Sequence, residues 1–418
     1  YNGTEAQITG SGLTTCNNLT ISNSKGVSQQ NAAGTSQNVV VTLTLDIDGG
    51  KYDFSGSENN LNTLTINGTE IYPLASNNLL SNKYSNLIIN ATGIKPDLYI
   101  PASITELNAL TIGVAAANSI TLNHDLTLYS PSTVALTLSS GKLVLGDNNL
   151  TILSTLANAI SGGSVSAMVV ADGNGYLRRS IPANIATSTV YVFPIGDLTD
   201  NPDYSPVSFA FTQTSATPAY RIIGVRVRDM QHPSDGTSND YITRYWNFTD
   251  SEHNNGAYTY NPTFTYSTTA TSDLVGTAAT LKLNRWDGSL WTQYVSTISS
   301  PSISATGLTK VTSPLHNNDF TGRFNSETIF VWQATDGGSY DFQDPFNWLP
   351  ARVSPQTNDV LSFSKGGSSI ANNVPTQSVG KVIVSNETNI TLEGQIGAAR
   401  TLSIAGPSSS QNLTIAAG

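Results

Sequence analysis

Apolar and polar residues alternate along most of this chain, in a short phrase that recurs many times. The phrase is an Asn or another small residue, then apolar–Thr–apolar, then a turn. It occurs at residues 18–21, 63–66, 86–89, 109–112, 149–152, 389–392 and 412–415. Alternation with a period of two predicts β-strands that have one buried face and one solvated face.

The spacing of the phrase predicts how these strands are arranged. Leu64, Leu87 and Leu110 follow one another at intervals of 23 residues. A fixed interval of this size predicts a β-solenoid, in which each rung buries its apolar face only against the rungs above and below. We therefore expect an elongated molecule. Its stacked core should consist of Leu64, Ile66, Leu87, Ile89, Leu110 and Ile112.

Changes in the length, spacing and aromatic content of the predicted strands indicate three domains in an all-β fold. Residues 1–159 form the β-solenoid-like array. Residues 160–328 carry longer, aromatic-rich strands, which predict an antiparallel β-sandwich. Within them, a turn at residues 172–175 predicts a β-hairpin. Residues 329–418 resume the rungs as the start of another repeat unit, and we expect Trp332 and Trp348 to cap that second array.

Composition narrows the classes of function. Charged residues make up 11% of the chain, against about 25% in a typical soluble domain. The net charge is −10, and no basic stripe is visible, so nucleic acid is not an expected partner. No apolar run approaches the length of a membrane span, and we expect no membrane insertion. Cys16 is the only cysteine, which excludes an internal disulfide and a site built on several thiolates.

Candidate metal ligands are few. Asp46 and Asp48 lie on the same face of a predicted strand, just before a turn, and could bind Ca²⁺ together with backbone oxygens. The remaining ligands of a recognisable calcium loop are missing, so a solvated strand end is the simpler interpretation. No other cofactor is expected. The four histidines lack partners at metal-ligand spacing, and we expect no catalytic residues among them: His124, His232, His253 and His316.

Two further patterns leave alternatives open. The aromatic residues of the middle domain could form a platform for stacking sugars, although core packing explains such residues more simply. They are Trp246, Trp286, Trp291, Tyr258 and Tyr260. Some β-solenoids cleave polysaccharides with acidic clusters and a basic catalyst, whereas the rungs here carry Thr, Asn and Ser. Carboxylate pairs for glycoside hydrolysis can converge from distant positions, and the sequence does not exclude them.

Three segments carry a resemblance to a known group of proteins. They are residues 331–360, with Val-Trp, Asn-Trp, Pro and Asp-Val in that order, the rung-ending run 141–150, and residues 173–207. The order of these motifs resembles that in the long repetitive cell-surface proteins of Bacteroidota that the type IX secretion system exports, including gliding-motility adhesins. The resemblance implies an internal piece of an extracellular protein at a bacterial cell surface.

The sequence therefore predicts a non-enzymatic structural and adhesive segment of a large repetitive surface protein. Its partners would be neighbouring repeats, other copies of the same protein, or cell-surface glycans. Two alternatives stay open. One is a self-assembling extracellular filament subunit, because the end rungs of a solenoid offer free strand edges. The other is a β-helix protein that binds carbohydrate or cleaves polysaccharide.

Overall fold

The computed structural model of the chain is all-β over the residues that it describes. These residues contain no α-helix, only the 3₁₀ turns η1 (Ala278–Thr280) and η2 (Pro345–Asn347). No helix among them is long and apolar enough to cross a lipid bilayer. The structure describes residues 3–9, 13–29, 35–68, 70–71, 78–91, 98–235, 238, 240–251, 256–268, 272–288, 291–310, 318–324, 329–397, 399–404 and 413–415.

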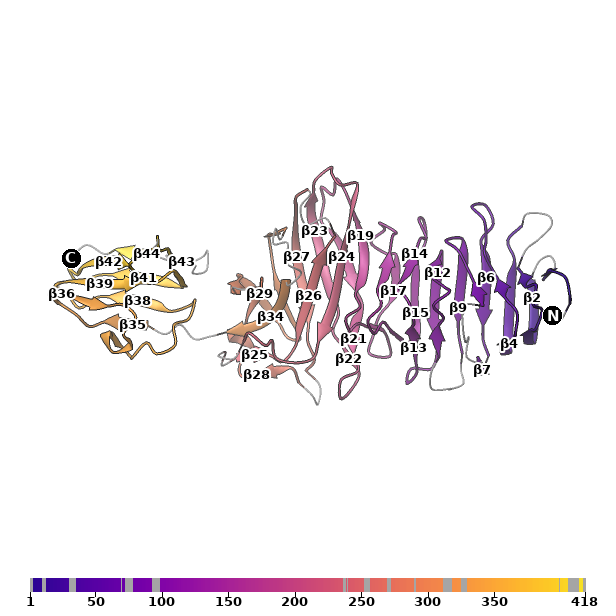
Figure 1. Cartoon of the computed structure of the whole chain (residues 1–418), viewed down its shortest axis with the longest axis horizontal. Helices are drawn as coiled ribbons and strands as arrows, with labels where there is room; N and C mark the ends of the chain where they lie inside the picture. The colour runs from indigo at the N-terminus through magenta and orange to yellow at the C-terminus, as the bar shows by residue number, and fades with distance from the viewer. Residues whose placement is uncertain are drawn as a thin grey trace.

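The first part of the chain is a β-solenoid, in agreement with the prediction. Successive coils stack their strands in parallel, and the longest ladder runs without interruption through eight strands in chain order (Figure 1). These strands are β2 (Leu13–Ile21), β4 (Asn38–Ile47), β6 (Asn62–Ile66), β9 (Ser85–Ile89), β12 (Ala109–Gly113), β15 (Leu136–Val144), β18 (Ala167–Val170) and β21 (Ile195–Asp197).

Other strands of the same coils form further parallel ladders on the remaining faces of the solenoid. The first of these ladders consists of β1 (Gln7–Ile8), β3 (Val27–Ser28), β5 (Tyr52–Asp53) and β8 (Leu79–Leu80). The second consists of β11 (Glu106–Leu107), β14 (Leu126–Leu128), β16 (Leu150–Ile152) and β19 (Leu177–Pro182). Shorter pieces complete these ladders: β7 (Glu70–Ile71), β10 (Tyr99–Ile100), β13 (Ser119–Leu122) and β17 (Ile160–Gly162). β15 turns a corner of its coil, because residues 136–140 pair with β12 and β17 and residues 141–144 pair with β13 and β18. The longest run of parallel pairs therefore passes from one face of the solenoid to the next at β15.

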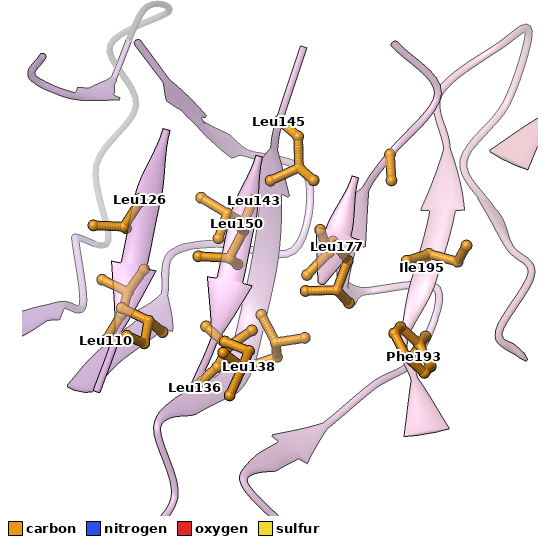
Figure 2. Packing of buried hydrophobic residues seen from close by; sticks show 14 of the residues in the cluster. Leu110, Leu126, Leu136, Leu138, Leu143, Leu145, Leu150, Leu177, Phe193 and Ile195 are labelled. Carbon is orange, nitrogen blue, oxygen red and sulfur yellow. The ribbon is translucent and has the colours of Figure 1, made fainter. Parts of the chain in front are cut away.

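The register of the rungs follows the recurring phrase. Leu64 lies opposite Leu87, Leu87 opposite Leu110, and Leu110 opposite Leu136. Like residues therefore stack on like residues inside the solenoid, as the leucines of the later coils do in Figure 2. The six residues expected in the stacked core are all buried, with at most 3% of their surface exposed.

The expected hairpin at residues 167–179 is wrong. β18 pairs in parallel with β15 and β21, and β19 pairs in parallel with β16, so the two strands belong to different faces of one coil. The turn between them lies directly on the turn of the preceding coil. A Cβ atom on Gly175 would lie 1.9 Å from the backbone oxygen of Asn148, which is far inside contact distance. Gly173 and Gly175 therefore allow this turn to stack closely on the turn of the preceding coil, and they do not mark a hairpin.

β19 is the strand at which the parallel solenoid becomes an antiparallel structure. One of its edges pairs in parallel with β16 and the other pairs antiparallel with β24. The sheet continues through β24 (Tyr220–Arg228), β26 (Tyr245–Asp250), β34 (Asn318–Phe324), β25 (Asp240–Ile242), β28 (Leu274–Val275), β29 (Lys282–Trp286) and β30 (Trp291–Gln293). A second antiparallel sheet contains β20 (Thr189–Phe193), β23 (Val207–Thr214), β27 (Tyr258–Thr265), β31 (Ser296–Ser299), β32 (Ser302–Ala305) and β33 (Leu308–Thr309). Outside this sheet, β22 (Asp203–Tyr204) pairs antiparallel with β21 of the solenoid.

Aromatic residues join these two sheets. The rings of Phe209 on β23 and Phe248 on β26 have centroids 5.3 Å apart, and those of Phe264 on β27 and Phe320 on β34 lie 5.1 Å apart. The buried residues form one cluster that extends from Leu19 to Phe320. Strand pairing and core packing therefore run across the boundary expected at residues 159 and 160, and that boundary stays a prediction.

Residues 329–415 have a hydrophobic cluster of their own and again stack parallel strands (Figure 1). The main sheet consists of β35 (Ile329–Trp332), β38 (Val360–Phe363), β41 (Lys381–Val384) and β44 (Leu413–Ile415), with β37 (Trp348–Leu349) antiparallel beside β35. Two smaller parallel sheets contain β36 (Asp336–Asp341), β39 (Ser368–Val374) and β42 (Asn389–Gly394), and β40 (Gln377–Val379) and β43 (Leu402–Ile404).

Candidate functional site

The most unusual side-chain cluster in the described residues is a buried arginine surrounded by four aspartates. Arg244, which directly precedes β26, has none of its surface exposed. Its Nε lies 2.8 Å from Asp273 Oδ2, and its Nη2 lies 3.3 Å from Asp203 Oδ2 and 3.2 Å from Asp229 Oδ1. Its Nη1 donates to Asp197 Oδ2. The carboxylates come from the ends of four different segments, which Arg244 holds together.

Further hydrogen bonds fix the carboxylates in place. Asp203 Oδ1 accepts from the Ser267 hydroxyl at 2.9 Å, and Asp197 Oδ1 accepts from the backbone N–H of Thr199 at 3.1 Å. The backbone N–H of Ser267 donates to Asp273. Because Asp197, Asp203 and Asp273 each have a second partner besides Arg244, the cluster links the last coil of the solenoid to the antiparallel sheets.

The charges in this cluster do not balance, since one guanidinium faces four carboxylates. Burial raises the pKa of Asp197 to about 7, although the charge of Arg244 acts in the opposite direction. Burial also raises the pKa of Asp229. Burial alone would lower the pKa of Arg244, but its bond to Asp273 and the surrounding carboxylates outweigh this and raise it. Protonation of Asp197 near neutral pH therefore relieves part of the negative charge.

The same carboxylates were tested as a metal site. Asp197, Asp203 and Asp229 each offer an oxygen, and these atoms lie within 4.8 Å of one another. All three also bind the guanidinium of Arg244, which already supplies positive charge at that point. The arrangement is that of an internal ionic cross-link. Asp46 and Asp48, the calcium candidates from the sequence, lie at the end of β4 and belong to no group of three metal-ligating residues in the described part of the chain.

His232 has a partner for each ring nitrogen. Its Nε2 lies 3.1 Å from Asp319 Oδ2, and its Nδ1 accepts from the backbone N–H of Ser234 at 3.1 Å. The side chain is buried, with 4% of its surface exposed. No ring nitrogen is left over to move a proton or to bind a metal. His124 is exposed, and His253 and His316 lie outside the described residues.

The structure separates the five aromatic residues that could have formed one sugar platform. Trp246, Tyr258 and Tyr260 are core residues, with at most 2% of their surface exposed. Trp286 and Trp291 are half-buried neighbours on β29 and β30, with ring centroids 5.3 Å apart. Only this pair is available to a ligand.

Trp332 and Trp348 lie opposite each other on β35 and β37, and their ring centroids are 5.0 Å apart. Both are buried, and each indole N–H has a partner: Trp332 donates to Ser369 Oγ at 3.0 Å and Trp348 to the backbone oxygen of Phe342 at 2.9 Å. β37 is the end strand of its sheet. The tryptophans therefore lie at the first rung of the second array, where we expected the cap.

Sequence reasoning missed a group of arginines on the outer face of the antiparallel structure. Arg178 on β19 and Arg226 and Arg228 on β24 are half-buried. The guanidinium carbons of Arg226 and Arg178 lie 4.8 and 5.9 Å from the centre of the Tyr176 ring. Strict alternation within β24 places Arg226 and Arg228 on one face and was a usable signal. The position of Arg178 depends on the pairing of β19 with β24.

Comparison with known proteins does not assign the chain to a family. No protein-family model, no curated protein and no solved structure matches the chain.

Proposed function

We propose that this chain is a structural and adhesive segment of a large repetitive protein at a bacterial cell surface. The observation that carries the proposal is the uninterrupted parallel ladder from β2 to β21, followed by a second parallel array from β35 to β44. Stacked rungs give length and stiffness with few residues, because each coil needs only its neighbours. A chain built mainly this way is suited to hold surfaces apart or to present a contact surface at a distance.

The antiparallel part is, in this proposal, a β-sandwich inserted between two solenoid arrays. The edge-to-face contact of Phe209 with Phe248 and the stacking of Phe264 on Phe320 join the two sheets and support this interpretation. The sandwich would supply the adhesive surface, since it carries the half-buried Trp286 and Trp291 and the outer arginines. The resemblance to type IX-exported surface proteins supports the extracellular location.

A non-catalytic role agrees with the side chains that could have carried chemistry. The His232–Asp319 pair has the composition of a catalytic dyad, yet the imidazole accepts a backbone N–H at the nitrogen that a general base would need. The buried aspartates near Arg244 are engaged with that arginine. Both clusters stabilise the fold in this proposal.

Small-angle X-ray scattering of the whole chain tests the elongated shape. A compact domain of 418 residues has a radius of gyration of about 22 Å. We expect a clearly larger value and an asymmetric distance distribution that do not change with protein concentration. A value at or below about 22 Å would contradict the proposal. Growth of the particle with concentration would favour the filament alternative instead.

A further inference from the structure

One face of the larger antiparallel sheet carries a row of polar and aromatic side chains across six strands, and the two central members, Asn247 and Asp319, are buried. Arg226 on β24 lies opposite Asn247 on β26, and Asn247 lies opposite Asp319 on β34. Asp319 lies opposite Trp286 on β29, and Trp286 opposite Trp291 on β30. β19, which bears Arg178, borders β24 on the other side. With adjacent strands about 4.8 Å apart, the five intervals from β19 to β30 span about 24 Å.

Three guanidinium groups gather at the β19 end of this row. The carbonyl and side-chain oxygens of Asn174 both accept from Arg226 Nη1 at 3.2 Å, and the side-chain oxygen also accepts from Arg228 Nη2 at 3.0 Å. Arg178 and Arg226 both approach the ring of Tyr176. The three positive charges therefore surround one exposed turn residue and one half-buried ring, an arrangement that we call the arginine face.

The arginine face has no carboxylate partner in the described part of the chain. None of Arg178, Arg226 and Arg228 takes part in an ion pair there, whereas Arg244, Arg323 and Arg352 each pair with aspartate. Two acids lie nearby, and both are engaged elsewhere. Asp172 accepts from the backbone N–H of Leu198, and Asp319 binds His232 and Asn247.

This concentration of positive charge stands out against the rest of the molecule. The chain has a net charge of −10 and no arginine before Arg178. Like charges held close together are unfavourable unless an anion joins them. Arg226 and Arg228 already donate to Asn174, to Asn247 and to the backbone oxygen of Asp172, and they contribute mainly their charge. The Arg178 guanidinium makes no hydrogen bond among the described residues and can bind a planar carboxylate or a sulfate through two parallel hydrogen bonds.

The other end of the row adds an apolar contact. Trp286 and Trp291 are half-buried and neighbour each other, and the guanidinium of Arg323 lies 4.6 Å from the centre of the Trp291 ring. Arg323 and His232, whose ring centroid lies 4.8 Å from that of Trp291, cover part of this pair. The indole surface that stays exposed can pack against the apolar face of a ring. Buried side chains separate the two ends, so a ligand that contacted both would have to be an extended polymer that carries anionic groups and ring faces.

We propose that the arginine face binds an acidic polysaccharide, by ionic hydrogen bonds to its carboxylate or sulfate groups. The inference rests on the proposed adhesive role and names the class of partner. A dense polyanion such as nucleic acid fits less well, because the surrounding molecule is acidic and would repel it.

Isothermal titration of the whole chain with polygalacturonate, at low salt and without calcium, tests the proposal. We expect binding that weakens as salt rises and that neutral dextran does not reproduce. Replacing all three residues, Arg178→Gln with Arg226→Gln and Arg228→Gln, should weaken binding at least about tenfold, as expected for the loss of charge-assisted hydrogen bonds. A sparsely sulfated galactan without carboxylates, in a parallel titration, distinguishes sulfate from carboxylate as the preferred group.

Two controls test whether any loss of affinity comes from the position of the arginines, from the loss of net charge or from a loss of folding. Lys25→Gln with Lys51→Gln and Lys83→Gln removes the same charge from exposed positions on the solenoid and should leave the affinity unchanged. The single variant Arg178→Gln should also weaken binding without lowering the melting temperature, because the Arg178 side chain makes no hydrogen bond among the described residues.

Equal affinity of the wild type and the triple arginine variant would overturn the proposal, as would no binding or stronger binding to single-stranded DNA. Scattering from the same preparations keeps the two ideas apart. An elongated particle that binds no acidic polysaccharide would refute the ligand and leave the structural role in place, whereas a compact particle would refute the structural role.

Discussion

The solenoid and the antiparallel structure of this protein use different means to hold themselves together. In the solenoid, residues such as Leu64 and Leu87 contact their counterparts one coil away, and the interior is aliphatic apart from Tyr52 and Phe54. In the antiparallel part, Arg244 binds Asp197, which lies 47 residues away, and His232 binds Asp319 across 87 residues. The solenoid repeats the same contact between neighbouring coils, whereas the antiparallel part also uses individual contacts between residues far apart in the sequence.

The distribution of buried charge shows the same contrast. Between residues 13 and 159, the one charged side chain buried among the described residues is Lys142, and burial lowers its pKa. The antiparallel part buries Arg179, Arg221 and Arg244 together with several aspartates. The repetitive region should therefore respond mainly to changes in its apolar stack, and the antiparallel region to changes in charge.

The largest expected effect is in the solenoid. Leu87→Asp places a carboxylate in a stack where Leu87 has only 2% of its surface exposed, with leucines on the rungs above and below. An unpaired buried charge costs several kcal/mol, so the coils around it should lose their cooperative structure. Hydrogen exchange measured along the chain reports the loss coil by coil.

Thr111→Asp is the matched control, because Thr111 lies between Leu110 and Ile112 on the solvated face of its rung. It should change the exchange of neighbouring amides little. The solenoid account fails if both variants keep wild-type protection, or if both lose it equally.

The next effect is in the antiparallel region. Arg244→Met leaves four aspartates without their common cation and should lower the free energy of unfolding by about 3–5 kcal/mol. Denaturant unfolding followed by tryptophan fluorescence measures this, since Trp246 lies two residues away and is buried. The same replacement at Arg178, on the outer face, should change stability by less than about 0.5 kcal/mol. Equal effects at the two positions would refute the cross-link.

The smallest effect is a pH dependence that belongs to one region only. The raised pKa of Asp197, about 7, means that the folded protein holds this proton more tightly than the unfolded chain does. The stabilisation is complete below the unfolded pKa near 4 and is lost as the pH rises through about 7. We expect the wild type to lose about 1–3 kcal/mol between pH 5 and pH 8.

Asp197→Asn should flatten this profile, whereas the exposed Asp48→Asn should leave it parallel to that of the wild type. Chemical denaturation at several pH values supplies the curves. A wild-type stability that rises between pH 5 and pH 8 would show that Arg244 outweighs burial at Asp197.

The same contrast explains how far the sequence could be interpreted. The interval of 23 residues is a local signal, and it predicted which leucines stack on which. The turn at residues 172–175 was misassigned because Asp-Gly and Asn-Gly favour hairpins as well as solenoid corners. What selects the corner is the approach of Gly175 to Asn148 in the preceding coil, and this contact is invisible in a single segment.

The candidate sites were harder to predict for the same physical reason. Asp197 and Asp203 flank the turn between β21 and β22, Asp229 follows β24, and Asp273 precedes β28, and no short motif joins them to Arg244. Their convergence depends on the pairing of β21 with β22 and of β25 with β28. Pairing between strands far apart in sequence is not encoded in their own alternation.

The most direct test of the central claim is the in-register stacking of the coils. In a Cys16→Ser background, Thr65→Cys with Ile88→Cys joins two residues that lie opposite each other on the solvated faces of β6 and β9. Thr65→Cys with Asn86→Cys is displaced by two residues, so its Cα atoms are about 8 Å apart and outside the range of a disulfide. Oxidation followed by mass spectrometry should find the disulfide in the first pair and free thiols in the second. Equal cross-linking of both pairs, or cross-linking of the displaced pair alone, would contradict the stacked solenoid.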